Sequence, residues 1–237
     1  IADIHYARGE LDEALRIRIE EQLPVFEKLG DVRERAVNLG KVADILHTRG
    51  ELDEALRIRC VEQLPVFDKL GDVRERAVAL GKIADILHAR GELDEALRIR
   101  IEEQLPVFEK LGDVRERAVT LGKIADIHYD RGELGEALRI RIEEQLPVFE
   151  KLGDVRERAA TLGKIADIHY ARGELDEDLR IRIEEQLPVF EKLGDVRSRA
   201  VTLGQIANIH YARGELDEAL RIRIEEQLPV FEKLGDV

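Results

Sequence analysis

The chain has 237 residues, of which 44% are apolar and 38% are charged, and its formal net charge is −13. No run of about 18 apolar residues occurs, so the sequence predicts no transmembrane helix and no membrane partner. Phosphate binding needs grouped Lys and Arg, so an acidic chain without a basic cluster is a poor candidate for nucleic acid. No signal peptide is visible, and the single Cys60 cannot form an internal disulfide; we therefore expect a cytoplasmic protein.

The sequence repeats with a period of 41 residues. All six prolines follow this period, at Pro24, Pro65, Pro106, Pro147, Pro188 and Pro229. The units begin at Ile1, Val42, Ile83, Ile124, Ile165 and Ile206. A fixed period of this length predicts a repeat array, so we treat residues 1–237 as one array. Because the chain starts at Ile1 and contains no Met, we expect a fragment of a longer protein.

Residues 10–29 carry the first long predicted helix. On a helical wheel one half-circle collects the apolar residues Leu11, Ala14, Leu15, Ile19, Leu23, Val25, Phe26 and Leu29. Only Ile17 lies outside this arc. The short alternation in Leu15–Ile19 is typical of a strand, but the helical pattern accounts for more positions. We therefore expect a helix that is buried against neighbours and ends at Gly30.

Pro24 lies in the middle of this predicted helix. Proline removes one helical hydrogen bond and clashes with the preceding turn. The four residues before it include no Ser, Thr, Asp or Asn that could cap a new helix. We therefore favour one continuous, kinked helix over two separate helices.

The next predicted helix begins at Asp31 and stops at Gly50. Asp31 followed three residues later by Glu34 is a capping-box pattern. Its predicted buried arc contains Val32, Ala36, Leu39, Gly40, Ala43, Leu46 and His47. Each unit is thus a hairpin of two helices, and the fold class is an all-α solenoid of stacked antiparallel helical hairpins.

The stretch "LGKIADILHARGELDEALRIR" at residues 80–100 resembles the tetratricopeptide repeat. The matching features are Leu80-Gly81, the turn at residues 91–96, and a proline late in the second helix. "KLGDVRERA" also resembles longer tetratricopeptide-like arrays of multidomain scaffold and sensor proteins. The unit is longer than the usual repeat of about 34 residues, so HEAT-like repeats are an alternative. The resemblance implies a right-handed superhelix whose first helices line a concave groove for protein partners.

Few residues suggest chemistry. The six histidines occur one per unit, and neighbouring helices are too far apart for shared metal ligation. Ser198 is the only serine, and Cys60 replaces an isoleucine of the predicted buried arc. No glycine-rich phosphate loop occurs. We therefore expect no catalytic residue, no metal site, no cofactor and no enzyme activity.

The resemblance implies a set of partner-binding residues on the first helices, beside Glu34, Val37 and Ile45. They are Lys41, Lys82, Lys123 and Lys164; Asp44, Asp85, Asp126 and Asp167; and, at the most variable position, Asn38 and Thr120. The last step of the array has Gln205 and Asn208 instead. One interpretation is a ladder that binds an extended peptide. The other is a solvated face of self-paired Lys and Asp, and both stay open.

The sequence therefore favours a protein-interaction scaffold with an unidentified protein or peptide partner. A sensor arm of a larger signalling ATPase and a self-stacking structural rod are the alternatives. Leu216, Leu220 and Leu228 of the last unit face no further unit, so head-to-tail self-association through uncapped ends is possible. Asp178 is the one odd residue in the interior, because every other unit has Ala there.

Overall fold

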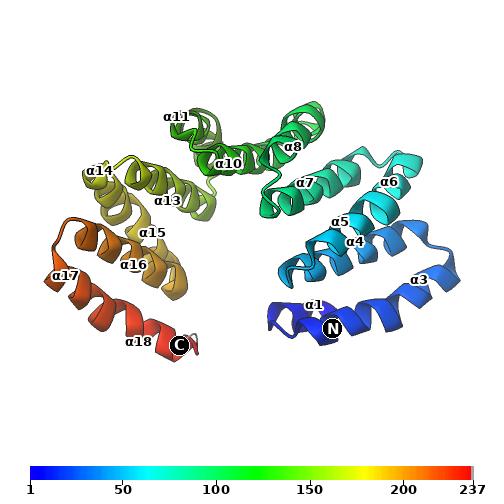
Figure 1. The fold of residues 1–237 in the computed structure, drawn as a ribbon, viewed down its shortest axis with the longest axis horizontal. Helices are drawn as coiled ribbons and strands as arrows, with labels where there is room; N and C mark the ends of the chain where they lie inside the picture. Colours follow the sequence, from blue (N-terminus) through cyan, green and yellow to red (C-terminus); the bar gives the residue numbers. More distant parts are fainter. Residues whose placement is uncertain (236–237) are drawn as a thin grey trace. The chain divides into compact units, whose positions relative to one another are not determined.

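The computed structural model describes residues 1–235. Asp236 and Val237, where another first helix was expected to begin, lie outside the described residues. Every regular element in the described part is helical, and none of these helices is long and apolar enough to cross a membrane. The chain divides into two compact units, Ile1–Thr120 and Leu121–Val237, and each is built from stacked helical hairpins (Figure 1).

The first helix of each hairpin is a single α-helix. These helices are α1 (Ala2–Ala7), α4 (Val32–Thr48), α7 (Val73–Ala89), α10 (Val114–Asp130), α13 (Val155–Ala171) and α16 (Val196–Ala212). The predicted cap is confirmed at α4, where the backbone N–H of Glu34 donates to the Asp31 carboxylate at 3.0 Å. The same bond recurs at Asp72, Asp154 and Asp195.

The second helix of each hairpin has three consecutive segments. The first segments are α2 (Leu11–Arg16), α5 (Leu52–Arg57), α8 (Leu93–Arg98), α11 (Leu134–Arg139), α14 (Leu175–Arg180) and α17 (Leu216–Arg221). The last are α3 (Leu23–Leu29), α6 (Leu64–Leu70), α9 (Leu105–Leu111), α12 (Leu146–Leu152), α15 (Leu187–Leu193) and α18 (Leu228–Leu234). Between them lie the π-helical turns η1 (Ile17–Gln22), η2 (Ile58–Gln63), η3 (Ile99–Gln104), η4 (Ile140–Gln145), η5 (Ile181–Gln186) and η6 (Ile222–Gln227).

The helix is therefore continuous past the proline, as expected, but the wide π turn was not predicted. At the end of η3 the N–H of Leu105 donates to the carbonyl of Arg100, five residues back. Pro106 then lies in the first turn of α9, where a missing N–H is tolerated. The wider turn accommodates the proline ring, which would clash with a carbonyl in a regular α-helix.

The π turn also changes which residues are buried. Ala96, Arg100, Gln104 and Phe108 are 0%, 3%, 6% and 0% exposed, so every fourth residue faces inward. In a straight α-helix each step of four residues rotates the side chain by about 40°, so the first and the last of these four residues would differ by about 120°. The π turn offsets this drift and keeps the four side chains on one face.

Several predictions about the buried arc of the second helix are wrong for this reason. Ile17, placed outside the arc, is 6% exposed, whereas Ile19, placed inside it, is 43% exposed. Val25 and Leu29 are also exposed. Cys60 occupies the position of Ile19 and is exposed as well. Its neighbours still partly desolvate the thiol, which raises the pKa of Cys60.

Each first helix between two hairpins packs on both sides. For example, α7 contacts α5, η2 and α6 of the preceding hairpin and α8, η3 and α9 of its own. The predicted arc of α4 is buried from Ala36 to Leu46, but Val32 at its start is 54% exposed. Ile45, expected on the open face, is 2% exposed. Two-sided packing explains this, because it leaves only a narrow strip of each first helix open.

Candidate functional site

A buried arginine lies beneath the open strip of the first helices. Arg59 in η2 is 3% exposed. It donates to Gln63 Oε1 at 2.6 Å, to the Gly40 carbonyl at 2.9 Å and to Asp44 Oδ1 at 2.6 Å. Burial lowers the pKa of Arg59, and Asp44 opposes that shift. A guanidinium stays charged in proteins, so Arg59 holds the Asp44 carboxylate by a charged pair.

The same arrangement recurs along the chain. Arg100 donates to Asp85, and Arg141 donates to Asp126, both at 2.6 Å. Sequence reasoning missed these arginines, although the second Arg of "RIR" and a Gln four residues later occur in all six units. The signal was present, but a straight helical wheel does not place this Arg inside.

The arginine network explains why the first helix has a glycine in its Leu-Gly pair. A Cβ atom at Gly81 would lie 2.1 Å from Nε2 of Gln104. Only a glycine therefore lets the glutamine lie against the helix backbone. The glutamine in turn accepts a hydrogen bond from Arg100 at 2.9 Å.

The predicted Asp and Lys residues do form a ladder, but it links consecutive hairpins. Lys82 Nζ lies 3.9 Å from Asp44 of the preceding hairpin, and Lys164 Nζ lies 3.7 Å from Asp126. The four predicted lysines are exposed. The carboxylates are only partly exposed, because the buried arginines hold them from below. Part of the self-paired interpretation is thus observed, with the buried arginine as the closer partner.

Asn38 and Thr120 do not lie open on this face. They are 2% and 1% exposed. Asn38 Oδ1 accepts a bond from Arg18, and Asn38 Nδ2 donates to the Arg18 carbonyl, both at 3.0 Å. Thr120 donates to the Glu116 carbonyl at 2.9 Å. This position is covered because it packs against a second helix, so the expectation of an exposed contact there is corrected.

A small niche lies within the ladder of the second unit. It measures about 60 Å³ and is lined by Asp126, Tyr129, Arg141, Lys164, Asp167 and Ile168. Burial raises the pKa of Tyr129, and the nearby Asp167 and Asp130 raise it further. This niche is too small for a side chain.

Comparisons with known proteins agree with this geometry. A family model described as "Tetratricopeptide repeat" matches residues 77–100. BtubC (BKLC) from P. vanneervenii has a TM-score of 0.74 over 97% of this chain and 92% of its own, at 16% identity. The chain has a tetratricopeptide-like repeat fold.

Two further solved structures extend the comparison. The signal transduction ATPase PH0952 from Pyrococcus horikoshii, a protein with a tetratricopeptide repeat sensor, has a TM-score of 0.76. This alignment covers 100% of this chain and 38% of that one, at 16% identity. A Rap protein complexed with Competence and Sporulation Factor has a TM-score of 0.62 over 99% of this chain and 74% of its own, at 13% identity. No curated protein matches the sequence.

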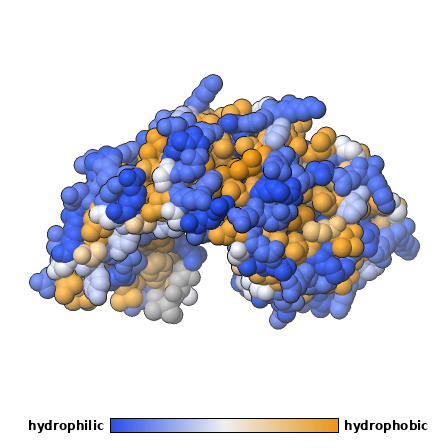
Figure 2. All heavy atoms as spheres, turned by 45° about the horizontal axis from the view of Figure 1, so that its top comes forward, coloured by the Kyte–Doolittle hydropathy of each residue, from blue (hydrophilic) through white to orange (hydrophobic). Residues whose placement is uncertain are grey.

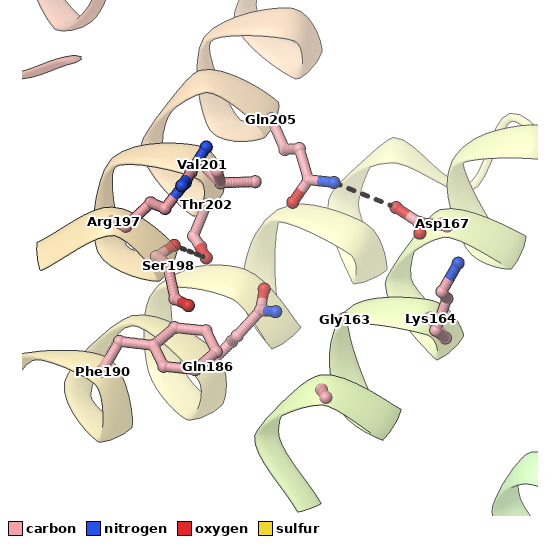
Figure 3. Close-up of a pocket in the computed structure, with 11 residues that line it drawn as sticks. Gly163, Lys164, Asp167, Gln186, Phe190, Arg197, Ser198, Val201, Thr202 and Gln205 are labelled. Atoms are coloured by element: carbon pink, nitrogen blue, oxygen red, sulfur yellow. Dashed lines mark hydrogen bonds between the residues drawn. The ribbon is translucent and has the colours of Figure 1, made fainter. Parts of the chain in front are cut away.

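The tetratricopeptide-like array has a larger cavity between α13, α15 and α16 (Figure 3). Its volume is about 410 Å³. It is lined by Ala160, Gly163, Lys164, Asp167, Gln186, Phe190, Arg197, Ser198, Val201, Thr202 and Gln205. In Figure 3 the Gln205 side chain crosses from α16 toward Asp167 on α13, to which its amide donates at 3.5 Å. The sequence did not predict this cavity.

Several histidines of the tetratricopeptide-like hairpins form local pairs near the ends of the first helices. Nδ1 of His128 contacts Glu133, and Nδ1 of His169 contacts Glu174. The bond from His128 lowers the pKa of Glu133. Within residues 1–235, no three His, Cys, Asp or Glu side chains come together as metal ligands would.

The face of the molecule drawn in Figure 2 is mixed in polarity. Figure 2 shows hydrophilic side chains over much of that face, with apolar areas between them.

Proposed function

We propose that the chain is a protein-interaction scaffold, and not an enzyme, whose first helices bind an extended segment of a partner protein in the cytoplasm. The observation that carries this proposal is the buried arginine under each ladder carboxylate. Arg59 and Arg141 fix Asp44 and Asp126 at 2.6 Å. Fixed charges lose little conformational entropy when a partner binds.

The chemistry of the ladder favours one kind of partner. Exposed lysines alternate with partly exposed aspartates within each unit. Such a pattern suits an extended segment that offers acidic side chains to the lysines and backbone N–H groups to the aspartates. The Rap structure supports this view, because that protein of the same fold is complexed with Competence and Sporulation Factor.

The test is selection of peptides from a displayed library on the immobilised chain, followed by affinity measurement. Replacing Lys82 and Lys164 by Glu should weaken the selected peptides about tenfold or more. The matched control replaces Lys69 and Lys151, which are exposed near the ends of the second helices, and should leave affinity within a factor of two or so. Equal weakening in both variants would contradict a site on the first helices.

A sensor arm is the second candidate, because PH0952 carries a tetratricopeptide repeat sensor within a signal transduction ATPase. In that case the parent protein contains a nucleotide-binding domain whose ATP hydrolysis responds to the array. Charge reversal at Lys82 and Lys164 would then change the response of hydrolysis to the ligand. A self-stacking rod is the remaining proposal, and mass in solution distinguishes it from both.

A further inference from the structure

The cavity between α13, α15 and α16 collects residues that depart from the other repeats. Ala160 stands where the other copies have Val37, Val78, Val119 and Val201. Ser198 stands where they have Glu34, Glu75, Glu116 and Glu157. Gln205 stands where they have Lys41, Lys82, Lys123 and Lys164. Three of the eleven lining residues are therefore departures, in an array whose units are otherwise nearly identical.

A fourth departure acts on the same place through Arg182. Asp178, which replaces Ala, is 0% exposed. Its Oδ1 accepts a bond from Arg182 Nε at 2.6 Å, and Gln205 Oε1 accepts one from Arg182 Nη1. In η2 the corresponding Nε, that of Arg59, is buried without a hydrogen bond. Asp178 and Gln205 thus give Arg182 two acceptors that its counterpart lacks.

The consequence falls on Gln186. In the other internal repeats the arginine donates to this glutamine at 2.6 Å (Gln63), 2.9 Å (Gln104) and 2.6 Å (Gln145). Here the distance from Arg182 Nη1 to Gln186 Oε1 is 3.5 Å. Gln186 is 6% exposed and lines the cavity. Its carbonyl is therefore a buried acceptor that the arginine no longer holds closely.

The other departures change the size and polarity of the cavity. Ala160 removes two methyl groups relative to Val, and Ser198 removes a long carboxylate. The resulting space of about 410 Å³ falls in the range of small ligand sites. Its walls combine the apolar Ala160, Val201 and Phe190 with four uncharged polar side chains and with the charged Lys164, Asp167 and Arg197. Because the buried acceptor, Gln186, is uncharged, the occupant that suits it has an apolar body and an uncharged hydrogen-bond donor at its tip.

We propose that this cavity is a subsite for a tyrosine side chain of the partner segment, an inference that rests on the proposed function. The ring packs on Ala160, Val201 and Phe190, and the phenol O–H donates to Gln186 Oε1. Phenylalanine fits less well, because it offers no donor to an acceptor that Arg182 holds only at 3.5 Å. A site of this kind also fixes the register, since a ladder of identical steps lets a segment shift by one repeat at little energetic cost.

The test uses N-acetyltyrosinamide as the probe and follows backbone and side-chain amide signals of the whole chain by NMR. We expect saturable shifts at Gln186, Ser198, Thr202 and Gln205. N-acetylphenylalaninamide should bind about fivefold more weakly, because it lacks the hydroxyl. Shifts scattered over many repeats, or equal affinity for the two probes, would overturn the inference.

Substitution toward the other repeats supplies the matched variants. The A160V/S198E/Q205K variant restores residues that fold at the same position elsewhere in this chain, and it should lose about fivefold or more in probe affinity. The control G135D also restores the common residue, but at an exposed position at the start of α11, away from the cavity, and should leave affinity unchanged. Unchanged affinity in the triple variant would refute the assignment.

The reverse experiment introduces the same cavity into the first compact unit, residues 1–120. The V37A/A55D/E75S/K82Q variant places the four departures at the corresponding positions between α4 and α7. A second set of saturable shifts near residue 75 is expected, and its absence would show that these residues do not define the subsite. Probe binding without any peptide binding would refute the proposed function alone, whereas peptide binding without probe binding at Ser198 would refute the subsite alone.

Discussion

Two helical glycines of this chain should respond in opposite ways to an added side chain. At Gly81 a Cβ would lie 2.1 Å from Gln104 Nε2, whereas at Gly135 no atom lies within 4 Å. Gly81→Ala should destabilise the protein by about 1–2 kcal/mol, because the displaced Gln104 loses its bond to Arg100. Gly135→Ala should stabilise it by about 0.5 kcal/mol through helix propensity. Urea unfolding of both variants measures this contrast.

A third variant tests whether the contact with Gln104 causes the destabilisation by Gly81→Ala. Gln104→Ala removes the atom that the new methyl group would meet. In the Gln104→Ala background, Gly81→Ala should then be neutral or stabilising, as measured by a double-mutant cycle. Equal destabilisation in both backgrounds would mean that the glycine is needed for another reason.

Asp178 is the second residue whose effect on stability has a definite sign. Burial raises the pKa of its carboxyl, although Arg182 opposes the shift. A raised pKa means that the folded state holds the proton more tightly than the unfolded state. The stability linked to this group is present below the ordinary Asp range and is lost as pH rises through the folded pKa.

Asp178→Ala should therefore raise the stability at pH 7, by about 1 kcal/mol. The gain should shrink as the pH falls toward about 3, below the ordinary Asp pKa of about 3.9, where the carboxyl is largely protonated in both states. Thermal melts at both pH values measure this difference. Asp217→Ala, at an exposed position, is the control and should show no such trend. A stability gain that grows as the pH falls would contradict this prediction.

At the residue scale the sequence predicted local features better than packed ones. The Asp31 cap depends only on its own turn, so the pattern was sufficient. The burial of Asn38 depends on Arg18 of another hairpin, which no local pattern reveals. The cavity was missed for a related reason, because Ala160, Gln186 and Ser198 come from three different helices.

At the scale of the element, the second helix shows what periodicity can and cannot predict. Its existence, its length and its continuity past the proline were predicted from apolar spacing. The inward face was not, because one π turn changes the angular position of every later residue. Ile17 and Ile19 exchange roles as a result. A hydrogen bond to the carbonyl five residues back cannot be recognised from a hydrophobic pattern plotted at 100° per residue.

The role of the proline in that helix can be tested with Pro106→Ala. Proline inside a regular helix is unfavourable by about 3 kcal/mol, but here it follows the π turn in the first turn of α9. The substitution should therefore raise the stability by less than about 1 kcal/mol. The turn itself should persist, because it keeps Arg100, Gln104 and Phe108 on one face.

Thermal unfolding and a structure of the variant provide the measurements. A gain near the full helix-interior value would mean that the proline strains the wild-type helix. A loss of stability would mean that the neighbouring hairpin requires the proline ring itself. In both cases the tolerated position described above would be the wrong explanation.

At the scale of the whole molecule, the last hairpin differs from the internal ones in what covers it. Leu179 and Leu187 pack against the core of the following hairpin. The corresponding Leu220 and Leu228 are 57% and 41% exposed. We expect association that grows with concentration, because this apolar surface matches what internal hairpins bury.

Sedimentation over a wide range of concentrations measures this association. L220E/L228E should abolish it, since charged side chains oppose burial in an apolar contact. V196E is the control, because Val196 is similarly exposed, at 54%, but lies elsewhere on its hairpin. A strict monomer at every concentration would contradict the prediction.

The recurrence of one arginine network in successive hairpins has a consequence for folding kinetics. A hairpin that docks on the wrong neighbour still finds the same glutamine, glycine carbonyl and aspartate for its arginine. When a hairpin docks one repeat out of register, the skipped repeat is left as a loop outside the stack. Closing a loop of that size adds only a modest entropic penalty. Misaligned intermediates are therefore nearly as well bonded as correct ones, and their escape requires breaking a buried charged contact. Refolding should thus include a slow phase from kinetic traps. Asp178 makes the arginine network of one hairpin different from that of the rest.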